Sequence, residues 1–362
     1  MAKALKIILK ITGILLAVIL AAALIYVIYM FVAYSRIEDN QSLSPKGAAP
    51  QNFANTNESY TVVTQNAGFG AYTADYTFFM DGGTESWAKS KESVIWCIDE
   101  AAKTAAKENP DFILFQEVDT DSTRSHHVNE YLQLEGHFAD YQSVSAVNYH
   151  SAFLMYPFYQ PHGSTNSCMV TFSRFGITSA VRRSLPISTS VSKFVDLDRC
   201  YSVSRIPVEN GRELVLYNVH LSAYGGSDEI RTAQMNMLFS DMKAEYDAGN
   251  YCVCGGDFNH DFTGDSTQTL NGGGAVDFGW AQPFPAELLP QGISQCIDYT
   301  AGEERPTCRN CDIPYVDGNF TIIVDGFLAS DNVTVTRLEN IQTGFAYADH
   351  NPVVMSFTLN EE

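Results

Sequence analysis

Four short apolar runs, each ending in a polar residue, constrain the fold of this chain most strongly. The runs occupy residues 61–66, 112–117, 214–220 and 251–257. Their length and apolar character predict buried β-strands. The polar residues that end them are Asn66, Glu117, His220 and Asp257. Because polar groups at strand ends usually face a site, we expect these side chains to face one.

Helical patterns alternate with the apolar runs. Residues 85–107 and 228–246 show helical periodicity, and no internal repeat or second linker interrupts the chain after residue 59. The remaining stretch of about three hundred residues can bury a large core, so residues 60–362 fit one α/β domain better than two. We therefore expect the polar motifs at strand-to-loop junctions of an α/β sandwich.

An uncharged apolar stretch at residues 11–34 is longer than the roughly 20 residues that a helix needs to cross a bilayer. Three lysines precede it, whereas Arg36 on the other flank is followed by two acidic residues. The positive-inside rule then leaves residues 1–10 in the cytoplasm and the domain outside, as in a single-pass protein of the cell membrane. A cleaved signal peptide is the competing interpretation, but its apolar core is typically only about 7–15 residues long.

Residues 35–59 are rich in Ser, Asn, Gln, Pro and Ala and have almost no large apolar side chains. Such a composition is typical of a flexible segment. We expect it to link the transmembrane helix to the domain that lies outside the cytoplasm.

The charge of the chain bears on its partners. It has 22 basic and 42 acidic residues, a net charge of −20. Three of the basic residues and none of the acidic ones precede Arg36, which leaves 19 basic side chains against 42 acidic ones in residues 36–362. Such a domain repels polyanions, so nucleic acid is a disfavoured partner unless basic residues cluster. The candidates for a cluster are Arg174, Arg182, Arg183, Arg199 and Arg205. Acidity alone also keeps an exposed domain soluble.

Eight cysteines are present. Cys252 and Cys254 lie two residues apart in an apolar run, which predicts core thiols. Cys296, Cys308 and Cys311 lie in a polar segment with one C-x2-C step, which could ligate zinc or form a disulfide. No fourth Cys or His lies nearby in the sequence, so we expect a local disulfide or free thiols.

Six motifs in a fixed order resemble those of the endonuclease/exonuclease/phosphatase (DNase I-like) family. They are Gln65-Asn66, Gln116-Glu117, Asn218-Val219-His220-Leu221, Gly255-Gly256-Asp257-Phe258-Asn259, Val324-Asp325-Gly326-Phe327 and Ala348-Asp349-His350-Asn351-Pro352. Ser173-Arg174-Phe175 resembles a further strand of the family. The resemblance covers nearly all of residues 60–359. It implies a four-layer α/β sandwich in which two packed mixed β-sheets are flanked by helices.

Hydrolysis of a phosphate ester needs neutralised charge and a proton acceptor, because the ester is anionic and water is a poor nucleophile. Glu117 offers the hard oxygen that Mg²⁺ prefers, and the resemblance implies it as the principal metal ligand, with Asn66 and Asp349 beside it. Mn²⁺ and Ca²⁺ are alternatives to Mg²⁺ as the cofactor. The sequence therefore predicts a metal-dependent phosphoric ester hydrolase.

His350 is the candidate general base, because imidazole titrates near neutral pH, and Asp325 resembles the carboxylate that orients it. Asp257 would position the attacking water or protonate the leaving oxygen. Asn259 would donate a hydrogen bond to the phosphoryl oxygens, and His220 would stabilise charge on a non-bridging oxygen. The candidate substrate contacts are Asn166, Arg174 and Tyr156.

The substrate has to be chosen by loops around this set. Residues 149–163 are dense in aromatics and broken by two prolines, so they could line a substrate pocket, dip into the bilayer interface or simply cover the sheet. Membrane anchorage, acidity and this segment favour a small or lipid phosphodiester, of a sphingomyelinase-like or phosphoinositide-like kind. An extracellular nuclease is the alternative enzyme, and a non-catalytic surface binding module on the same fold is a further one.

Overall fold

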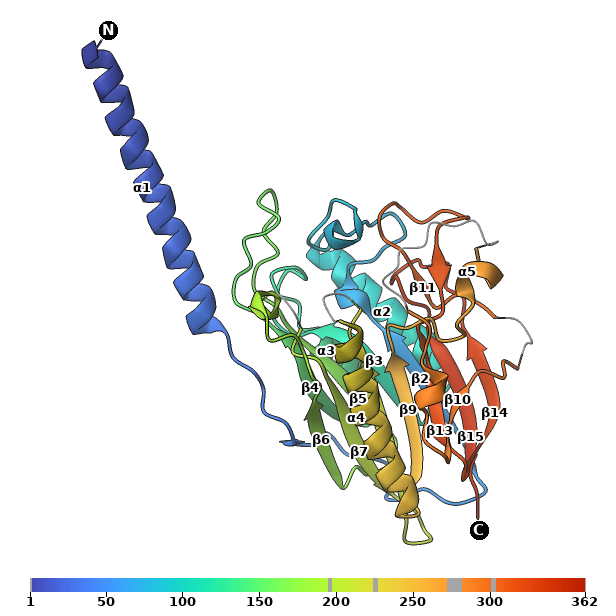
Figure 1. Cartoon of the computed structure of the whole chain (residues 1–362). Helices are drawn as coiled ribbons and strands as arrows, with labels where there is room; N and C mark the ends of the chain where they lie inside the picture. Colours follow the sequence, from blue (N-terminus) through green and yellow to red (C-terminus); the bar gives the residue numbers. More distant parts are fainter. Residues whose placement is uncertain (1, 195–196, 224–226, 272–281, 301–303, 362) are drawn as a thin grey trace.

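Two β-sheets pack face to face in the computed structural model, and helices cover their outer faces (Figure 1). The structure describes residues 2–194, 197–223, 227–271, 282–300 and 304–361. The six-stranded sheet has the order β14 (Val333–Asn340), β15 (Val353–Leu359), β2 (Ser59–Asn66), β3 (Phe112–Asp119), β5 (Asn166–Ser173) and β4 (Gln142–His150). The seven-stranded sheet has the order β1 (Gln41–Leu43), β6 (Ser179–Ser184), β7 (Cys200–Pro207), β8 (Glu213–His220), β9 (Tyr251–Asp257), β13 (Asp325–Ser330) and β10 (Ile293–Cys296). A small two-stranded sheet joins β11 (Cys308–Arg309) and β12 (Thr321–Ile322).

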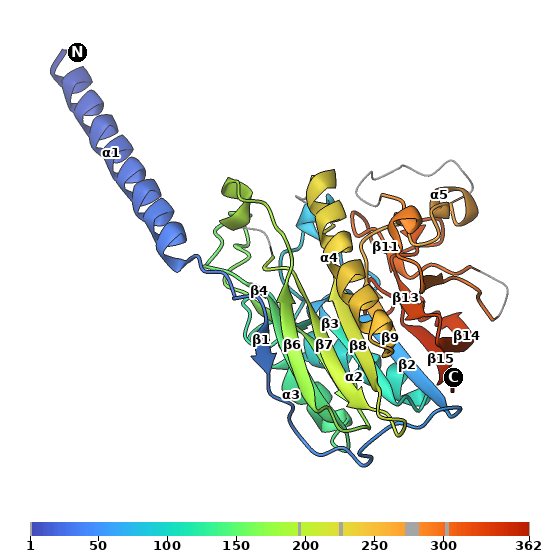
Figure 2. The same cartoon turned by 60° about the horizontal axis from the view of Figure 1, so that its bottom comes forward.

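The α-helices form the outer layers of the domain. They are α2 (Lys91–Lys107), α3 (Glu130–His137), α4 (Asp228–Asp247) and the short α5 (Ser266–Thr269), in addition to the N-terminal α1 (Ala2–Ala33). Apolar residues of α2 and α3 share a core with the six-stranded sheet, and those of α4 share one with the seven-stranded sheet (Figure 2). The predicted four-layer sandwich is therefore confirmed. Of the two helical patterns, 228–246 matches α4, whereas α2 begins only at Lys91, where the Ser90 hydroxyl accepts a hydrogen bond from the backbone N–H of Ser93.

Burial on both faces explains why the strands appear as continuous apolar runs. Val62 of β2 packs between the sheets with Leu114 and Leu216, while Val63 packs on the outer face with Val94 of α2. Successive side chains of a strand point to opposite faces, so a strand covered on both sides needs apolar residues at every position. The four predicted runs all fall within strands, namely β2, β3, β8 and β9.

The N-terminal helix α1 projects away from the domain in both views (Figures 1 and 2). It has 32 residues and begins before the predicted apolar stretch, because the helix also includes the three lysines that precede it. Its length and hydropathy are sufficient to cross a membrane, and a signal sequence would meet the same criteria. The chain therefore has a helix that could serve as a membrane span or a signal anchor.

The segment 35–59 is ordered against the domain, which corrects the prediction of a flexible linker. Its strand β1 pairs with β6 at the edge of the seven-stranded sheet. Arg36 forms an ion pair with the buried Asp198 (Nε to Oδ1, 2.8 Å), and Ala54 is fully buried and bridges to Val208. The pairing of β1 with β6 and the bridge at Ala54 use backbone groups, so composition alone could not predict them.

Candidate active site

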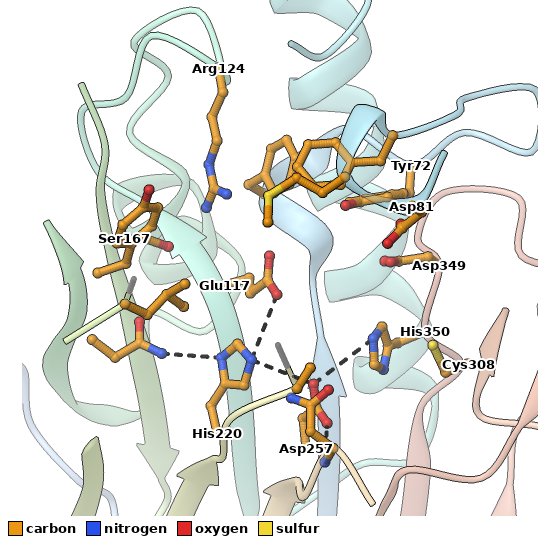
Figure 3. Close-up of a pocket in the computed structure, with 18 of the residues that line it drawn as sticks. Tyr72, Asp81, Glu117, Arg124, Ser167, His220, Asp257, Cys308, Asp349 and His350 are labelled. Carbon is orange, nitrogen blue, oxygen red and sulfur yellow. Dashed lines mark hydrogen bonds and ion pairs between the residues drawn. The ribbon is translucent and has the colours of Figure 1, made fainter. Parts of the chain in front are cut away.

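The ends of several strands converge at one edge of the sheets. The parallel pair β2 and β3 sets Asn66 beside the step Gln116–Glu117. In the other sheet, parallel β8 and β9 set His220 opposite Asp257, and antiparallel β13 sets Asp325 opposite the same residue. Backbone hydrogen bonds impose these registers, so side chains that are distant in the sequence meet in one pocket (Figure 3).

Glu117 lies at a β-bulge. The pairing of β3 with β5 shifts register between Phe115 and Val118, and the backbone φ of Glu117 is 53°. A left-handed conformation is uncommon for a residue other than glycine and concentrates at functional sites. The bulge turns the carboxylate of Glu117 into the pocket, where its side chain is 23% exposed.

Asn66 connects two carboxylates. Its Nδ2 donates to Oε1 of Glu117 (3.2 Å) and to Oδ2 of Asp257 (3.1 Å), while its Oδ1 accepts from the backbone N–H of Gly68 (2.9 Å). In this orientation its nitrogen faces the two acids and its oxygen accepts one hydrogen bond, so its predicted role as a metal ligand stays a prediction. Asn66 holds Glu117 and Asp257 in place.

Asp257 lies between two imidazoles. Its Oδ2 is 3.6 Å from Nε2 of His220 and 3.9 Å from Nε2 of His350. Burial raises the pKa of Asp257 to about 7; His350 opposes this shift, whereas the charge of Asp325 adds to it. A carboxyl group with a pKa near neutrality can both give and accept a proton under physiological conditions.

The last part of β9 needs glycine at one position. Gly256 has a φ of 149°, and a Cβ there would lie 2.1 Å from the backbone oxygen of Val219. Beyond it, the backbone N–H of Asn259 donates to Oδ1 of Asp257 (2.9 Å), and Nδ2 of Asn259 donates to the backbone oxygen of Leu221 (2.9 Å). An amide nitrogen has two hydrogens, so the second one is available to a ligand in the pocket that Asn259 lines.

His350 is held by Asp325. Its Nδ1 lies 2.7 Å from Oδ2 of the fully buried Asp325, which makes Nδ1–H the donor and, in the neutral ring, leaves Nε2 as the acceptor toward the pocket. Burial by itself lowers the pKa of His350, but the charges of Asp325 and Asp349 and the hydrogen bond to Asp325 raise it well above its usual value, so the ring has to lose its Nε2 proton before it can act as a base. The ligand-type atoms of Asp257, Asp325 and His350 all lie within 4.8 Å of one another.

His220 has a partner that the sequence did not suggest. Nδ2 of Asn148, two residues before the end of β4, lies 3.1 Å from Nδ1 of His220. Burial lowers the pKa of His220 well below its usual value, and the nearby Arg199, His350 and Arg124 add to this effect. The imidazole is therefore neutral, and Asn148 fixes its orientation. No strand end or motif marks Asn148 in the sequence.

Asp349 offers an unused oxygen to the pocket. Its Oδ1 is buried and has no hydrogen-bond partner among the described residues. Burial raises the pKa of Asp349 to about 7; His350 opposes this shift and Glu117 adds to it. Two carboxylates, Glu117 and Asp349, thus line one pocket and influence each other electrostatically. An orphaned buried oxygen beside a second carboxylate fits a hard divalent cation.

Three arginines that the sequence reasoning did not place in the site also line this pocket: Arg124, Arg199 and Arg309. Arg124 donates twice to Asp119 (Nε 3.0 Å and Nη2 2.9 Å) and lies over the ring of Phe69. Arg309 is buried and donates from Nη2 to the backbone oxygen of Thr73 (3.1 Å). Guanidinium groups suit phosphate oxygens, so the pocket combines metal-ligand oxygens with cationic walls.

The three residues predicted to contact the substrate do not line the pocket. Asn166 begins β5, but its neighbour Ser167, rather than Asn166, lines the pocket. Tyr156 is 65% exposed and packs against Phe79 outside the pocket. Arg174 follows the other end of β5, roughly 20 Å along the strand from the pocket, and donates to Oδ1 of Asn109 (2.7 Å). The assignment of Arg174 is corrected on this ground.

The arginines proposed as a basic cluster are dispersed. Arg182 is buried and donates to backbone oxygens, while Arg183 pairs with Asp39 and Arg205 pairs with Glu213. Arg199 is the member that reaches the pocket. Paired or buried guanidinium groups give little nonspecific attraction to a polyanion, which agrees with the disfavoured nucleic-acid partner.

All eight cysteines lie within the described residues, and each is buried and free. Cys252 and Cys254 pack in the core, as predicted. Cys308 lines the pocket, and its backbone bridges to that of His350. Burial raises the pKa of the Cys308 thiol to about 12, which keeps it protonated and a poor metal ligand.

Solved structures show the same arrangement of sheets. An endonuclease/exonuclease/phosphatase from Beutenbergia cavernae DSM 12333 matches with a TM-score of 0.53 and 18% identity, over 83% of this chain and 72% of that one. A family protein from Leptotrichia buccalis C-1013-b matches with a TM-score of 0.54 and 16% identity, over 82% and 99% of the two chains. ANGEL2, described as a 2',3'-cyclic phosphatase, matches with a TM-score of 0.54 and 13% identity, over 89% and 99%. At these identities the likeness shows the fold.

The packed sheets and the polar pocket at their edge are those of a metal-dependent phosphoesterase or nuclease type of fold. A family model described as the endonuclease/exonuclease/phosphatase family matches residues 95–344. The chain belongs to this family, whose members are metal-dependent hydrolases of phosphate esters. A comparison with curated proteins gives no match.

Proposed function

We propose that this chain is a membrane-anchored, Mg²⁺-dependent phosphoesterase whose domain acts outside the cell. Its favoured substrate is a small or lipid phosphodiester. The observation that carries the proposal is the buried chain of contacts from Asp325 to His350 to Asp257, which ends in the pocket that Glu117 and Asp349 line. These groups can take a proton from water and hold a cation at the same place.

His350 acts as the general base in this proposal. Its Nδ1–H donates to Asp325, so Nε2 accepts a proton from the attacking water on the pocket side. Asp325 stabilises the imidazolium that forms, because a buried carboxylate at 2.7 Å favours the charged ring. Water then attacks in line with the leaving oxygen in a single step.

Asp257 and His220 contact the phosphoryl group and its attacking or leaving oxygen. Asp257, with a pKa of about 7, positions the attacking water or protonates the leaving oxygen. Neutral His220 donates from Nε2 to a non-bridging oxygen, because Asn148 engages Nδ1. Asn259 donates its free amide hydrogen to the same phosphoryl group.

Glu117 and Asp349 would hold the metal ion. Their carboxylates supply hard oxygens, which suit Mg²⁺ and also Mn²⁺ or Ca²⁺. When bound, the cation neutralises phosphate charge and polarises the phosphoryl oxygen. Asn66 keeps Glu117 in position through the hydrogen bond from Nδ2.

Helix α1 supports the membrane part of the proposal. The helix has a mean hydropathy of 2.8 over its most apolar window, and that window is not buried against the domain. Three lysines lie at its N-terminal end, so the positive-inside rule orients residues 1–10 to the cytoplasm and residues 60–362 to the outside. Cleavage of α1 as a signal sequence would instead release the domain.

Hydrolysis by the full chain in detergent, with Mg²⁺ or with EDTA, tests the proposal. The substrates are sphingomyelin, phosphoinositides, plasmid DNA and a generic phosphodiester. Glu117→Gln should lose metal dependence together with activity, and His350→Ala should lose about 10²–10⁴-fold in rate. Glu58→Gln and His137→Ala, at exposed positions away from the pocket, are the matched controls. Metal-dependent nicking of DNA alone would favour the nuclease, and equal binding without turnover in all variants would favour a binding module.

A further inference from the structure

The loop between β4 and β5 carries a cluster of exposed apolar side chains. Its residues 153–159, which we call the aromatic loop, include Tyr156, Phe158 and Tyr159 with exposed fractions of 65%, 80% and 68%. Val191 of the 3₁₀ helix η3 (Val191–Phe194), exposed by 80%, lies beside them. Soluble domains seldom expose so many large apolar side chains together, and such patches usually meet a partner.

The aromatic loop rises on the side of the domain that faces α1 (Figure 1). Met155 and Phe158 line one apolar groove with helix residues that range from Ile19 to Phe31. Counted back from the helix end at Ala33, Tyr26 lies about 10 Å and Ala22 about 17 Å along the axis, at 1.5 Å per residue. The hydrocarbon core is about 30 Å thick, so these levels fall near or within its outer half if α1 spans the membrane.

Hydrogen bonds from α1 pair with backbone N–H and C=O groups of the aromatic loop at the level of Tyr26 and Tyr29. The Tyr26 hydroxyl donates to the backbone oxygen of Phe153 (3.1 Å) and accepts from the N–H of Met155 (3.1 Å). The Tyr29 hydroxyl accepts from the N–H of Phe153 (2.9 Å). Leu154 and Gly163 exchange two backbone hydrogen bonds of 2.9 and 3.0 Å. Unpaired backbone groups are costly in lipid, so a loop at this level needs such partners.

The distribution of charged residues around the loop also fits a location in the outer part of the membrane. Residues 149–163 contain no Asp, Glu, Lys or Arg, in a chain that is strongly acidic elsewhere. Lys193 lies at the edge of the patch, with its Nζ 5.1 Å from the ring centre of Tyr34 and 5.3 Å from that of Phe194. An amine next to aromatic rings is typical of the boundary between hydrocarbon and head groups.

We propose that the aromatic loop, together with η3, inserts into the outer leaflet of the membrane that α1 spans and holds the pocket mouth at the lipid surface. The 3₁₀ helix η2 (Phe79–Asp81) joins the two sites, because Phe79 contacts Tyr156 (ring centres 5.8 Å apart) while Met80 and Asp81 line the catalytic pocket. The substrate is then a phosphate ester in the head group of a lipid of that membrane, an inference that rests on the proposed function.

Depth-dependent quenching tests the insertion without any need for activity. All eight native cysteines are buried, so Phe158→Cys in the full chain can be labelled selectively with a fluorescent maleimide and reconstituted into phosphatidylcholine vesicles. Lipids with a spin label on the acyl chain should quench this dye, and iodide in the buffer should not. Val316→Cys, at a position 58% exposed on another loop, is the matched control and should respond only to iodide. Quenching of the Phe158 position by iodide, or by neither agent because a second copy covers it, would overturn the proposal.

Hydrolysis assays distinguish a loss of membrane insertion from a loss of function in the catalytic pocket. Phe158→Asp should slow the full chain on lipid head groups in vesicles by about tenfold, because a charge replaces an aromatic ring that the proposal places in lipid, and should leave hydrolysis of a soluble phosphodiester unchanged. Val316→Asp should change neither rate. Equal rates of the wild type and Phe158→Asp on vesicles would contradict the proposal that the aromatic loop inserts into the membrane. Inactivity of the wild type on every ester would refute the proposed function, while the quenching result would still report on insertion.

Discussion

The hydrogen bond between His350 and Asp325 allows a sharp test of the proposed base. Asp325→Asn keeps the size of the side chain but removes the charge at 2.7 Å from Nδ1. An asparagine nitrogen that faces Nδ1 would stabilise the other tautomer, in which Nε2 carries the hydrogen and cannot accept a proton. A positioned general base contributes about 10²–10⁴-fold, so kcat should fall by that factor, about 3–5 kcal/mol in activation free energy.

The assay is steady-state hydrolysis of a soluble phosphodiester with saturating Mg²⁺. We expect kcat to fall and KM to change little, because neither residue contacts substrate in the ground state in this proposal. His350→Ala should lose about as much as Asp325→Asn, and the double variant should lose no more, because the two residues act as a unit. Asp331→Asn, at the exposed position after the other end of β13, is the control. Losses that simply add in the double variant, or a nearly unchanged kcat in Asp325→Asn, would refute the reasoning.

Three further predictions concern stability and metal binding. Asn218→Ala should lower the free energy of unfolding by about 2–4 kcal/mol in urea titrations, because the buried amide of Asn218 donates to the backbone oxygens of Phe115 and Val170 and both would lose that donor. Burial lowers the pKa of His162 to about 3, so its stabilising effect is complete above pH 6.5 and is lost as the pH falls toward 3. Between pH 7 and 5 the wild type should therefore lose about 2 kcal/mol more stability than His162→Gln, and parallel unfolding curves would contradict this. Because the pKa of Asp349 is about 7, calorimetry should show that Mg²⁺ affinity falls by up to about tenfold per pH unit below 7, whereas a flat profile would argue against Asp349 as a ligand.

Strand ends were the most informative part of the sequence. Asn66, Glu117, His220 and Asp257 were expected to face one site because each ends an apolar run, and all four lie together around the pocket. Their roles were harder to predict. In the structure the Asn66 oxygen accepts from the backbone N–H of Gly68 while its nitrogen faces Glu117 and Asp257, and this local geometry leaves no trace in composition.

Site residues that do not end an apolar run could not be predicted from strand ends. Asn148 lies within β4, where only the packing of the two sheets sets it against His220. Arg309 lines the pocket from the two-residue strand β11, and the sequence gives no register for that segment. Arg174 was misplaced for the converse reason: it adjoins a strand, but at the end away from the site.

The sequence by itself determined the strand pattern, the apolar N-terminal helix and the set of chemical groups, because these depend on local periodicity and residue type. Tertiary structure alone decided which groups touch. The β-bulge aims Glu117, the antiparallel pairing of β13 with β9 brings Asp325 to the catalytic edge, and segment 35–59 packs against the domain despite its polar composition. Such contacts join residues far apart in the chain, and their geometry follows from sheet register and from the packing of the layers, which no local pattern encodes.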